Sequence, residues 1–310
     1  MLQLLLELAP CLIGGLWLGR RLPDLPERIA PVLLRWGVPL SLVGLILKGG
    51  LNSGTLQAAL FSLVLTSTGL LVTRKWPQLS RALPARSLQL GAVVGNTAYF
   101  GLPVAIALLP AAALSFSITY DLVGTLVTWS VGPLLLNGQR SRPEQWLRQL
   151  MTTPVCQAVV IAGPLLISPW SATIAALLWW PARMVLWLML LLVGMRLGRL
   201  LSRGDEPGAA LAIHQLIPAL VIKLLLLPGL TVLTGSVLSW PALLRDALVL
   251  QAGAPTAMSV LLLAEASQQK SRESIPAAQL VLWSTLLALI SVPLWWWVLN
   301  QPALQPTVAM

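Results

Sequence analysis

Long apolar stretches separated by short polar connectors run through the whole chain. A helix needs about 20 mostly apolar residues to cross the hydrocarbon core of a bilayer. By this criterion the pattern predicts an all-α membrane protein with ten transmembrane helices. The predicted spans are residues 2–19, 31–50, 55–73, 87–109, 112–136, 151–169, 172–196, 209–230, 242–265 and 276–299.

Two of these stretches carry a proline and amide side chains near their middle. The first contains Gly95–Pro103 and the second contains Gln251–Ser259, with Pro255 inside it. Lipid does not satisfy unpaired backbone groups, so a broken helix persists only where protein or a water-filled cavity covers it. The pattern therefore predicts that the fourth and ninth helices are broken and buried in the protein.

The two broken stretches occupy corresponding places in the two halves of the chain. Residues 1–136 form the first predicted five-helix repeat, 137–150 a cytoplasmic linker and 151–310 the second repeat. Because five is an odd number, the second repeat must enter the membrane with inverted polarity. Paired interrupted helices in inverted repeats point to a substrate site where they cross, near the bilayer midplane.

Composition agrees with this interpretation. Hydrophobic residues make up 57% of the 310 residues and charged residues only 10%, whereas a soluble domain carries about 25% charged residues. The lipid bilayer is therefore an expected partner. The net charge of +10 does not indicate nucleic acid binding, because the basic residues form no single run or patch.

The basic residues instead predict the topology. Of the 20 Lys and Arg, all but Lys48, Arg183, Lys223 and Arg245 lie in or beside the connectors that follow the odd-numbered spans. Loops rich in Lys and Arg stay in the cytoplasm. The chain is thus expected in the cell inner (plasma) membrane, with both termini on the non-cytoplasmic side.

The broken stretches supply the candidate substrate-binding residues. Asn96, Thr97 and Gln251 bear side chains that can bond a polar or anionic ligand, and Gly101 and Gly253 allow the backbone to approach it closely. Half-helix N-termini add a positive dipole end, which favours a carboxylate. The alternative is that the amides only repair the helix breaks by bonding freed carbonyls.

Ionisable residues inside membrane spans are costly and indicate function. Asp121 in the fifth span is a candidate for coupling transport to a proton or a sodium ion, and Lys223 in the eighth span could pair with it or attract an anionic substrate. The alternative is a static Asp–Lys pair that joins two helices. Arg183 is expected to be structural or interfacial. The sequence predicts no metal site, since it has one histidine and no Cys/His cluster with ligand spacing.

Three segments resemble the auxin efflux carrier family. They are Asn96–Pro103, the stretch from Gln251 through Pro255 to Glu265, and the tenth-span residues Ser284-Thr285-Leu286 with Pro293-Leu294. The resemblance implies a ten-helix fold like that of the bile-acid:sodium symporters, with helices four and nine crossing at Pro103 and Pro255. It also implies that Asn96 and Gln251 contact the substrate.

The same resemblance implies that the helices form two domains with different roles. Helices 1, 2, 6 and 7 would form a scaffold that dimerises, and helices 3–5 and 8–10 a transport domain that moves like an elevator. Substrates of the family are small organic anions, among them indole-3-acetate, malate and malonate.

Together these observations predict a secondary-active carrier of small organic anions that needs no cofactor beyond a coupling ion, H⁺ or Na⁺. One alternative is a sodium-coupled symporter of the bile-acid type, and another is a membrane receptor that does not transport. An enzyme is not expected, because the sequence has no phosphate-binding lysine loop, nucleophile-elbow serine or zinc-protease motif.

Overall fold

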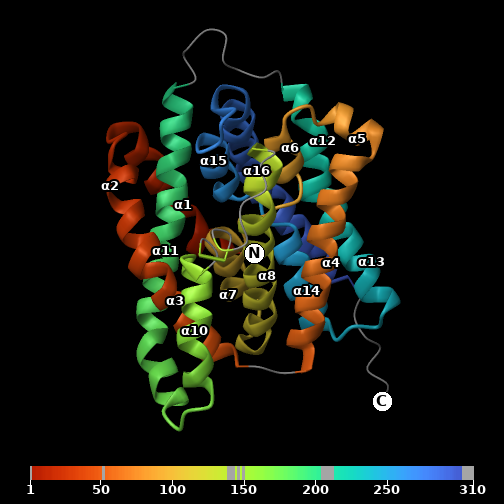
Figure 1. Ribbon diagram of the computed structural model, residues 1–310. Coiled ribbons are helices and arrows are strands. Elements are labelled where there is room, and N and C mark those ends of the chain that lie inside the picture. Colours follow the sequence, from red (N-terminus) through yellow and green to blue (C-terminus); the bar gives the residue numbers. More distant parts are fainter. Residues whose placement is uncertain are drawn as a thin grey trace. The chain divides into compact units, whose positions relative to one another are not determined.

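The computed structural model describes residues 2–50, 53–137, 144, 147–148, 151–203 and 213–301. These residues are helical nearly throughout (Figure 1), which confirms the predicted all-α class. Among the described residues, six helices are long and apolar enough to cross a membrane, so the chain is a multi-pass membrane protein. They cover Leu25–Gly49, Gly54–Lys75, Ala111–Asn137, Ser171–Arg199, Ile217–Val237 and Arg272–Leu299.

The stretches predicted as the fourth and ninth spans each form two shorter helices. Residues 87–109 contain α6 (Arg86–Gly91) and α7 (Leu102–Leu108), and residues 242–265 contain α14 (Ala242–Ala252) and α15 (Met258–Glu265). Elsewhere the boundaries shift. The predicted sixth span is the shorter α10 (Pro154–Leu166), and the eighth ends later, at Val237, because Pro228 does not terminate it. Residues 204–212 and most of the predicted linker lie outside the described residues.

The chain divides into two compact units. Unit 1 comprises residues 1–55, 98–118 and 139–210, and unit 2 comprises residues 56–97, 119–138 and 211–310. The division does not follow the two halves of the sequence, since each unit takes segments from both.

Unit 1 is built around a close contact between α1 (Leu2–Arg21) and α11 (Ser171–Arg203). Helix α3 (Val38–Gly49) packs on α11 and on α10, while α2 (Leu25–Val32) precedes α3. Glycines make the first contact possible: a Cβ atom on any of them would overlap a backbone carbonyl of the facing helix. Small residues four apart let two membrane helices approach to backbone contact. The glycines are Gly15, Gly19, Gly194 and Gly198.

A cationic side chain lies halfway along α11. The Arg183 guanidinium carbon is 5.4 Å from the centre of the Trp187 ring, 5.8 Å from that of Trp179 and 5.9 Å from that of Trp180. Aromatic ring faces attract cations at such distances. These contacts agree with a structural role for Arg183.

Unit 2 packs its broken and unbroken helices around one apolar core. Helix α15 packs against α16 (Lys270–Leu299) and α6, and α13 (Leu227–Val237) packs against α14. The unit also contains α4 (Ser53–Lys75), α5 (Pro77–Ala82), most of α8 (Leu114–Asn137) and α12 (Ile217–Val221). The buried core includes Leu90, Val93, Val260, Ala264, Ala277 and Val281.

Buried Glu273 of α16 fixes the start of α6. Its carboxylate accepts hydrogen bonds from the backbone N–H groups of Arg86 (3.3 Å) and Ser87 (2.8 Å). The Arg86 guanidinium in turn donates to the carbonyls of Leu135 (3.2 Å) and Leu136 (3.3 Å), near the end of α8. Two helix ends are thereby satisfied by side chains, as buried helix termini require.

Three five-residue π-helical segments each end two residues before a proline. A proline lacks an N–H group and its ring clashes with the carbonyl four residues earlier. Widening the helix by one residue relieves this clash, so Val38 N–H bonds Leu33 O and Leu227 N–H bonds Ile222 O, five residues back. The segments are Leu33–Gly37 before Pro39, Thr97–Gly101 before Pro103 and Ile222–Leu226 before Pro228.

We expect Gly19→Ala to destabilise unit 1, because its methyl group would collide with the Met195 carbonyl. Overpacking of this kind costs about 1–3 kcal/mol, and thermal unfolding in detergent measures the loss. Gly163→Ala in α10 is the matched control, since a Cβ there meets no atom within 4 Å. Equal melting temperatures for the two variants would contradict the tight helix contact.

Candidate functional site

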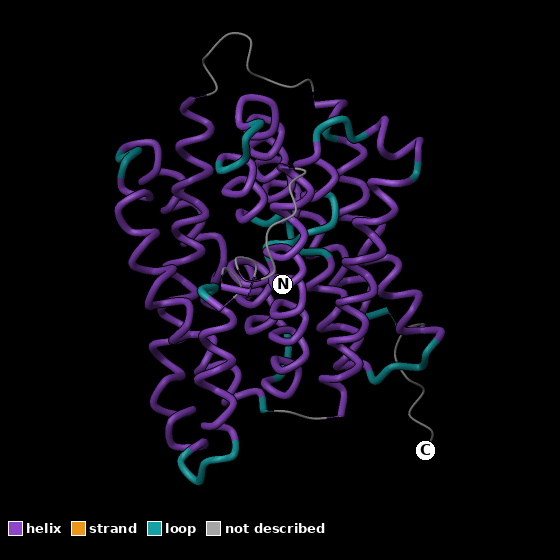
Figure 2. The backbone as a smooth tube through the Cα atoms, viewed as in Figure 1, coloured by secondary structure: helices purple, strands orange, loops and turns teal. Residues whose placement is uncertain are grey.

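Two extended segments of unit 2 replace helix at the breaks. Residues 92–96 follow α6, and residues 253–257 lie between α14 and α15. Each begins with a residue of helical conformation, Ala92 or Gly253, and the later residues, 94–96 and 255–257, make the pairing described next. In Figure 2 such breaks are short teal stretches between purple helices. Inside a membrane the main-chain groups of such segments need partners from the protein.

The two segments satisfy one another. They run antiparallel and are joined by two backbone hydrogen bonds, which together form a single isolated β-bridge. Asn96 N–H bonds Pro255 O (2.6 Å) and Ala257 N–H bonds Val94 O (3.1 Å), which makes Gly95 and Thr256 the bridge partners. The amide residue of one break and the proline of the other thus meet directly.

The ends of the two preceding half-helices are also satisfied, by side chains. The Thr256 hydroxyl donates to the carbonyl of Gly91, the last residue of α6 (2.9 Å). The Lys223 ammonium donates to the carbonyl of Ala252, the last residue of α14 (2.7 Å). The Ser284 hydroxyl oxygen of α16 accepts a hydrogen bond from Thr256 N–H at 3.0 Å.

We call the paired residues 94–96 and 255–257 the crossing. The Lys223 side chain is 1% exposed and reaches the crossing from the π-helical segment Ile222–Leu226. A Cβ atom built on Gly95 would lie 3.0 Å from its Nζ atom. The ammonium therefore lies against both extended segments, beside Gly95 of one and next to Ala252, where the other begins. One alternative from the sequence is a static ion pair between Lys223 and Asp121, and the observed contact of Lys223 differs from it.

Asp121 is equally buried, with 1% exposure. Its Oδ1 atom accepts a hydrogen bond of 2.5 Å from the Thr97 hydroxyl, while its Oδ2 atom has no hydrogen-bond partner among the described residues. Both Asp121 and Lys223 are described, and they form no ion pair with each other. They nevertheless contact the same short stretch, since Gly95 and Thr97 are two residues apart.

The two predicted amides lie at the crossing and are buried. Gln251 is fully buried, and neither Oε1 nor Nε2 has a hydrogen-bond partner among the described residues. Asn96 is 4% exposed, and its backbone rather than its side chain pairs with Pro255. Most buried polar groups in proteins are hydrogen-bonded, so an unpartnered amide needs an explanation. Repair of the helix break is not that explanation, because Thr256 and Lys223 bond the freed carbonyls.

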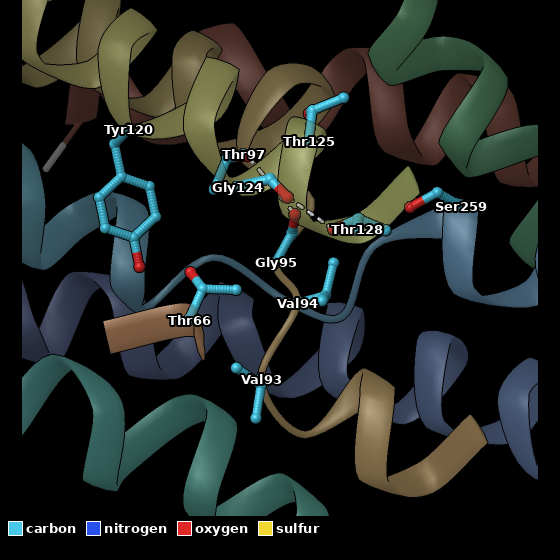
Figure 3. A pocket seen from close by; sticks show the side chains of 10 residues that line it. All are labelled: Thr66, Val93, Val94, Gly95, Thr97, Tyr120, Gly124, Thr125, Thr128 and Ser259. Carbon is cyan, nitrogen blue, oxygen red and sulfur yellow. Dashed lines mark hydrogen bonds between the residues drawn. The ribbon is translucent and has the colours of Figure 1, made fainter. Parts of the chain in front are cut away.

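A small cavity lies beside the first extended segment (Figure 3). Its volume of about 30 Å³ has room for one or two water molecules. Hydroxyl groups from α4, α8, α15 and the π-helical segment that starts at Thr97 line it, so it is polar as well as small. The lining residues are Thr66, Val93, Val94, Gly95, Thr97, Tyr120, Gly124, Thr125, Thr128 and Ser259.

The predicted prolines and glycines do not all lie at the crossing. Pro255 lies in the crossing, but Pro103 is the second residue of α7, six residues after Thr97, and takes no part in the backbone pairing. The first break precedes Pro103 because a π-helical segment, ending at Gly101, accommodates this proline within a helix. Gly253 ends α14 as its C-cap.

Thr256 and Ser284 belong to the crossing although the sequence did not single them out as site residues. Both are hydroxyl residues within apolar stretches, and Thr256 directly follows Pro255. A hydroxyl residue beside a helix-breaking proline is the signal that could have identified Thr256, since hydroxyls commonly satisfy freed backbone groups.

No cluster of three or more His, Cys, Asp or Glu residues that could hold a metal ion occurs in the part of the chain that the structure describes. No protein-family model matches the sequence, and no curated protein matches it significantly.

We expect Thr256→Val to destabilise unit 2, since it leaves the buried Gly91 carbonyl without its donor. An unsatisfied buried group costs about 1–3 kcal/mol. Thr68→Val makes the same chemical change at an exposed position of α4 and should leave the melting temperature nearly unchanged. If both variants unfold alike, the hydroxyl does not hold the crossing together.

Proposed function

We propose that this protein is a secondary-active carrier of small organic anions, and that the anion's carboxylate binds at the crossing of the two broken stretches. The single observation that carries the proposal is the buried Gln251 amide, whose donor and acceptor atoms have no partner within the described chain. A ligand that bonds this amide would remove its desolvation cost.

The charge distribution around the crossing favours an anion. The carbonyl ends of α6 and α14 are covered by the Thr256 hydroxyl and the Lys223 ammonium. The N-terminus of α15 has no side-chain cap, because Ala257 occupies its N-cap position. Helix N-termini attract negative charge. The uncapped N-terminus of α15 and the Lys223 ammonium therefore both favour a carboxylate.

The proposal includes the finer features that the sequence predicts. These are ten spans in two inverted repeats, both termini outside the cytoplasm, and a likeness to auxin efflux carriers. The two compact units support a scaffold and a transport domain. Unit 1 contains predicted helices 1, 2, 6 and 7, and unit 2 most of helices 3–5 and 8–10. Residues 98–118 depart from this scheme, since they belong to unit 1.

In this scheme the transport domain would move as an elevator and the scaffold would form the homodimer. Asp121 and Lys223 are the proposed coupling groups because both are buried and touch the segment around Asn96. Asp121 would exchange a proton or face a sodium ion during the cycle.

A sodium-coupled symporter of the bile-acid type is the second candidate. The observation that favours it is the hydroxyl-lined cavity beside Thr97, whose oxygen atoms are of the kind that bind hard cations. A receptor that binds the anion without transporting it is separated from both carriers by flux measurements alone.

The proposal is tested with purified protein and a panel of indole-3-acetate, malate, malonate and related carboxylates. A ligand that binds only the folded state raises the melting temperature by mass action. We expect a shift with at least one carboxylate and none with the matching amide. Uptake of that carboxylate into sealed vesicles then distinguishes a carrier from a receptor. No shift with any carboxylate would contradict the anion site.

Gln251→Leu separates a ligand-binding amide from a structural one. We expect the free energy of unfolding to stay equal or to rise by about 1–3 kcal/mol, because an unsatisfied buried amide is removed. The carboxylate-induced shift should be lost in this variant and weakened in Asn96→Ala. A binding assay together with thermal unfolding measures both effects.

Gln89→Leu is the matched control for this change. The Gln89 amide donates to the Leu83 carbonyl at 3.0 Å, so its removal should lower stability and leave ligand binding intact. The assignment of Gln251 to the ligand fails if Gln251→Leu destabilises the protein as Gln89→Leu does and still binds the carboxylate normally.

A further inference from the structure

We propose that the Lys223 ammonium is a built-in cation of the crossing, which occupies the place where a carrier of this kind would otherwise need a bound sodium ion. The role of the ammonium follows from contacts within unit 2. Only its consequence for transport rests on the function proposed above.

The C-terminal end of α14 favours a positively charged group beside it. The last carbonyls of a helix have no intrahelical partner and carry the negative end of the helix dipole. At the crossing this end is buried, since Ala252 and Gly253 are both inaccessible. In transporters with broken helices such ends and the adjacent unwound carbonyls are where Na⁺ is coordinated.

Lys223 places its side-chain ammonium at this helix end. Its Nζ atom lies 2.7 Å from the Ala252 carbonyl oxygen, and its Cε atom would lie 3.2 Å from a Cβ on Gly95. The ammonium thus fills the space between the end of α14 and the opposing extended segment. Glycine at position 95 leaves the room that it needs.

The local backbone holds the lysine in this position. Pro228 prevents a normal helical bond to the carbonyl four residues before it, which belongs to Leu224. The Trp295 indole N–H bonds this freed carbonyl at 2.8 Å. The π-helical segment that carries Lys223 is therefore fixed at two points after the lysine, by Trp295 of α16 at the Leu224 carbonyl and by Pro228.

The positive charge is not cancelled by a carboxylate. Lys223 forms no ion pair among the described residues, and its one hydrogen-bond acceptor is the Ala252 carbonyl. The corresponding carbonyl at the end of α6 is covered by the neutral Thr256 hydroxyl. A protonated Lys223 side chain thus brings to the crossing the single positive charge that a bound sodium ion would bring.

This arrangement predicts that stability and carboxylate binding do not depend on sodium. The first experiment uses no carboxylate and measures thermal unfolding in sodium chloride and in choline chloride at equal ionic strength. Wild-type protein should melt at the same temperature in both salts. Lys223→Ala should melt roughly 5 °C or more lower in choline, because the carbonyl loses its donor.

Rescue then tests whether the ammonium position itself is what matters. Millimolar ethylammonium or sodium should raise the melting temperature of Lys223→Ala by occupying the vacated space. Lys223→Met, which fills this space with an apolar chain, should show no rescue. Lys75→Ala, at an exposed position of α4, controls for general salt effects and should behave as wild type.

Gly95→Ala gives an independent test, since its Cβ would crowd the ammonium at 3.0 Å. It should lower the melting temperature of the wild-type protein and have a much smaller effect in the Lys223→Ala background. This pair of variants decides the question even if rescue is weak.

Three results would overturn the proposal. They are a sodium-specific stabilisation of wild-type protein, a Lys223→Ala variant that is indifferent to added cations, and equal effects of Gly95→Ala in both backgrounds. If Lys223→Ala does not fold, a Lys223→Met variant as stable as wild type would also overturn it. A negative carboxylate panel with positive rescue would refute the anion carrier but not the built-in cation.

Discussion

A membrane offers no water to a main-chain N–H or C=O group, and this constraint explains the centre of unit 2. Two helices stop, and the segments that follow them must find partners within the protein. They find them in each other, through Asn96 and Pro255 and through Ala257 and Val94. The carbonyl ends left behind are bonded by Thr256 and Lys223. Every other feature of the site is arranged around this pairing.

The polar side chains of unit 2 consequently fall into two groups. Glu273, Thr256 and Lys223 bond backbone groups at helix ends, so their polarity is used within the fold. Gln251 and the Oδ2 atom of Asp121 are buried without such a use, as are the Ser87 and Ser291 hydroxyls. A buried polar atom without a partner lowers stability, and among these positions Gln251 and Asp121 lie at or beside the crossing, where a function outside the fold is expected.

The sequence predicted what depends on local composition and on membrane physics. The apolar stretches, their helical class and the interruptions near Asn96 and Gln251 follow from span length and from the residues within the spans. Pro103 shows the limit of this reasoning, since a proline can be accommodated by a π-helical segment as well as by a break. Contacts between residues far apart in the sequence could not be predicted. Glu273 bonds backbone groups nearly two hundred residues earlier, and Lys223 bonds a carbonyl on another helix. The local pattern of apolar and polar residues indicates neither contact.

The π-helical segment at Ile222–Leu226 also makes the site sensitive to chain length. Each residue of an α-helix turns the following ones by about 100°. The extra residue in this segment rotates the residues before it, relative to α13 and Pro228, away from the positions that a continuous α-helix would give them. Loss of a single residue between Lys223 and Pro228 would restore the clash of the proline ring with the preceding turn, and it would rotate the side chain at position 223 to another face. The number of residues between Lys223 and Pro228 is therefore constrained independently of which side chains this helix carries.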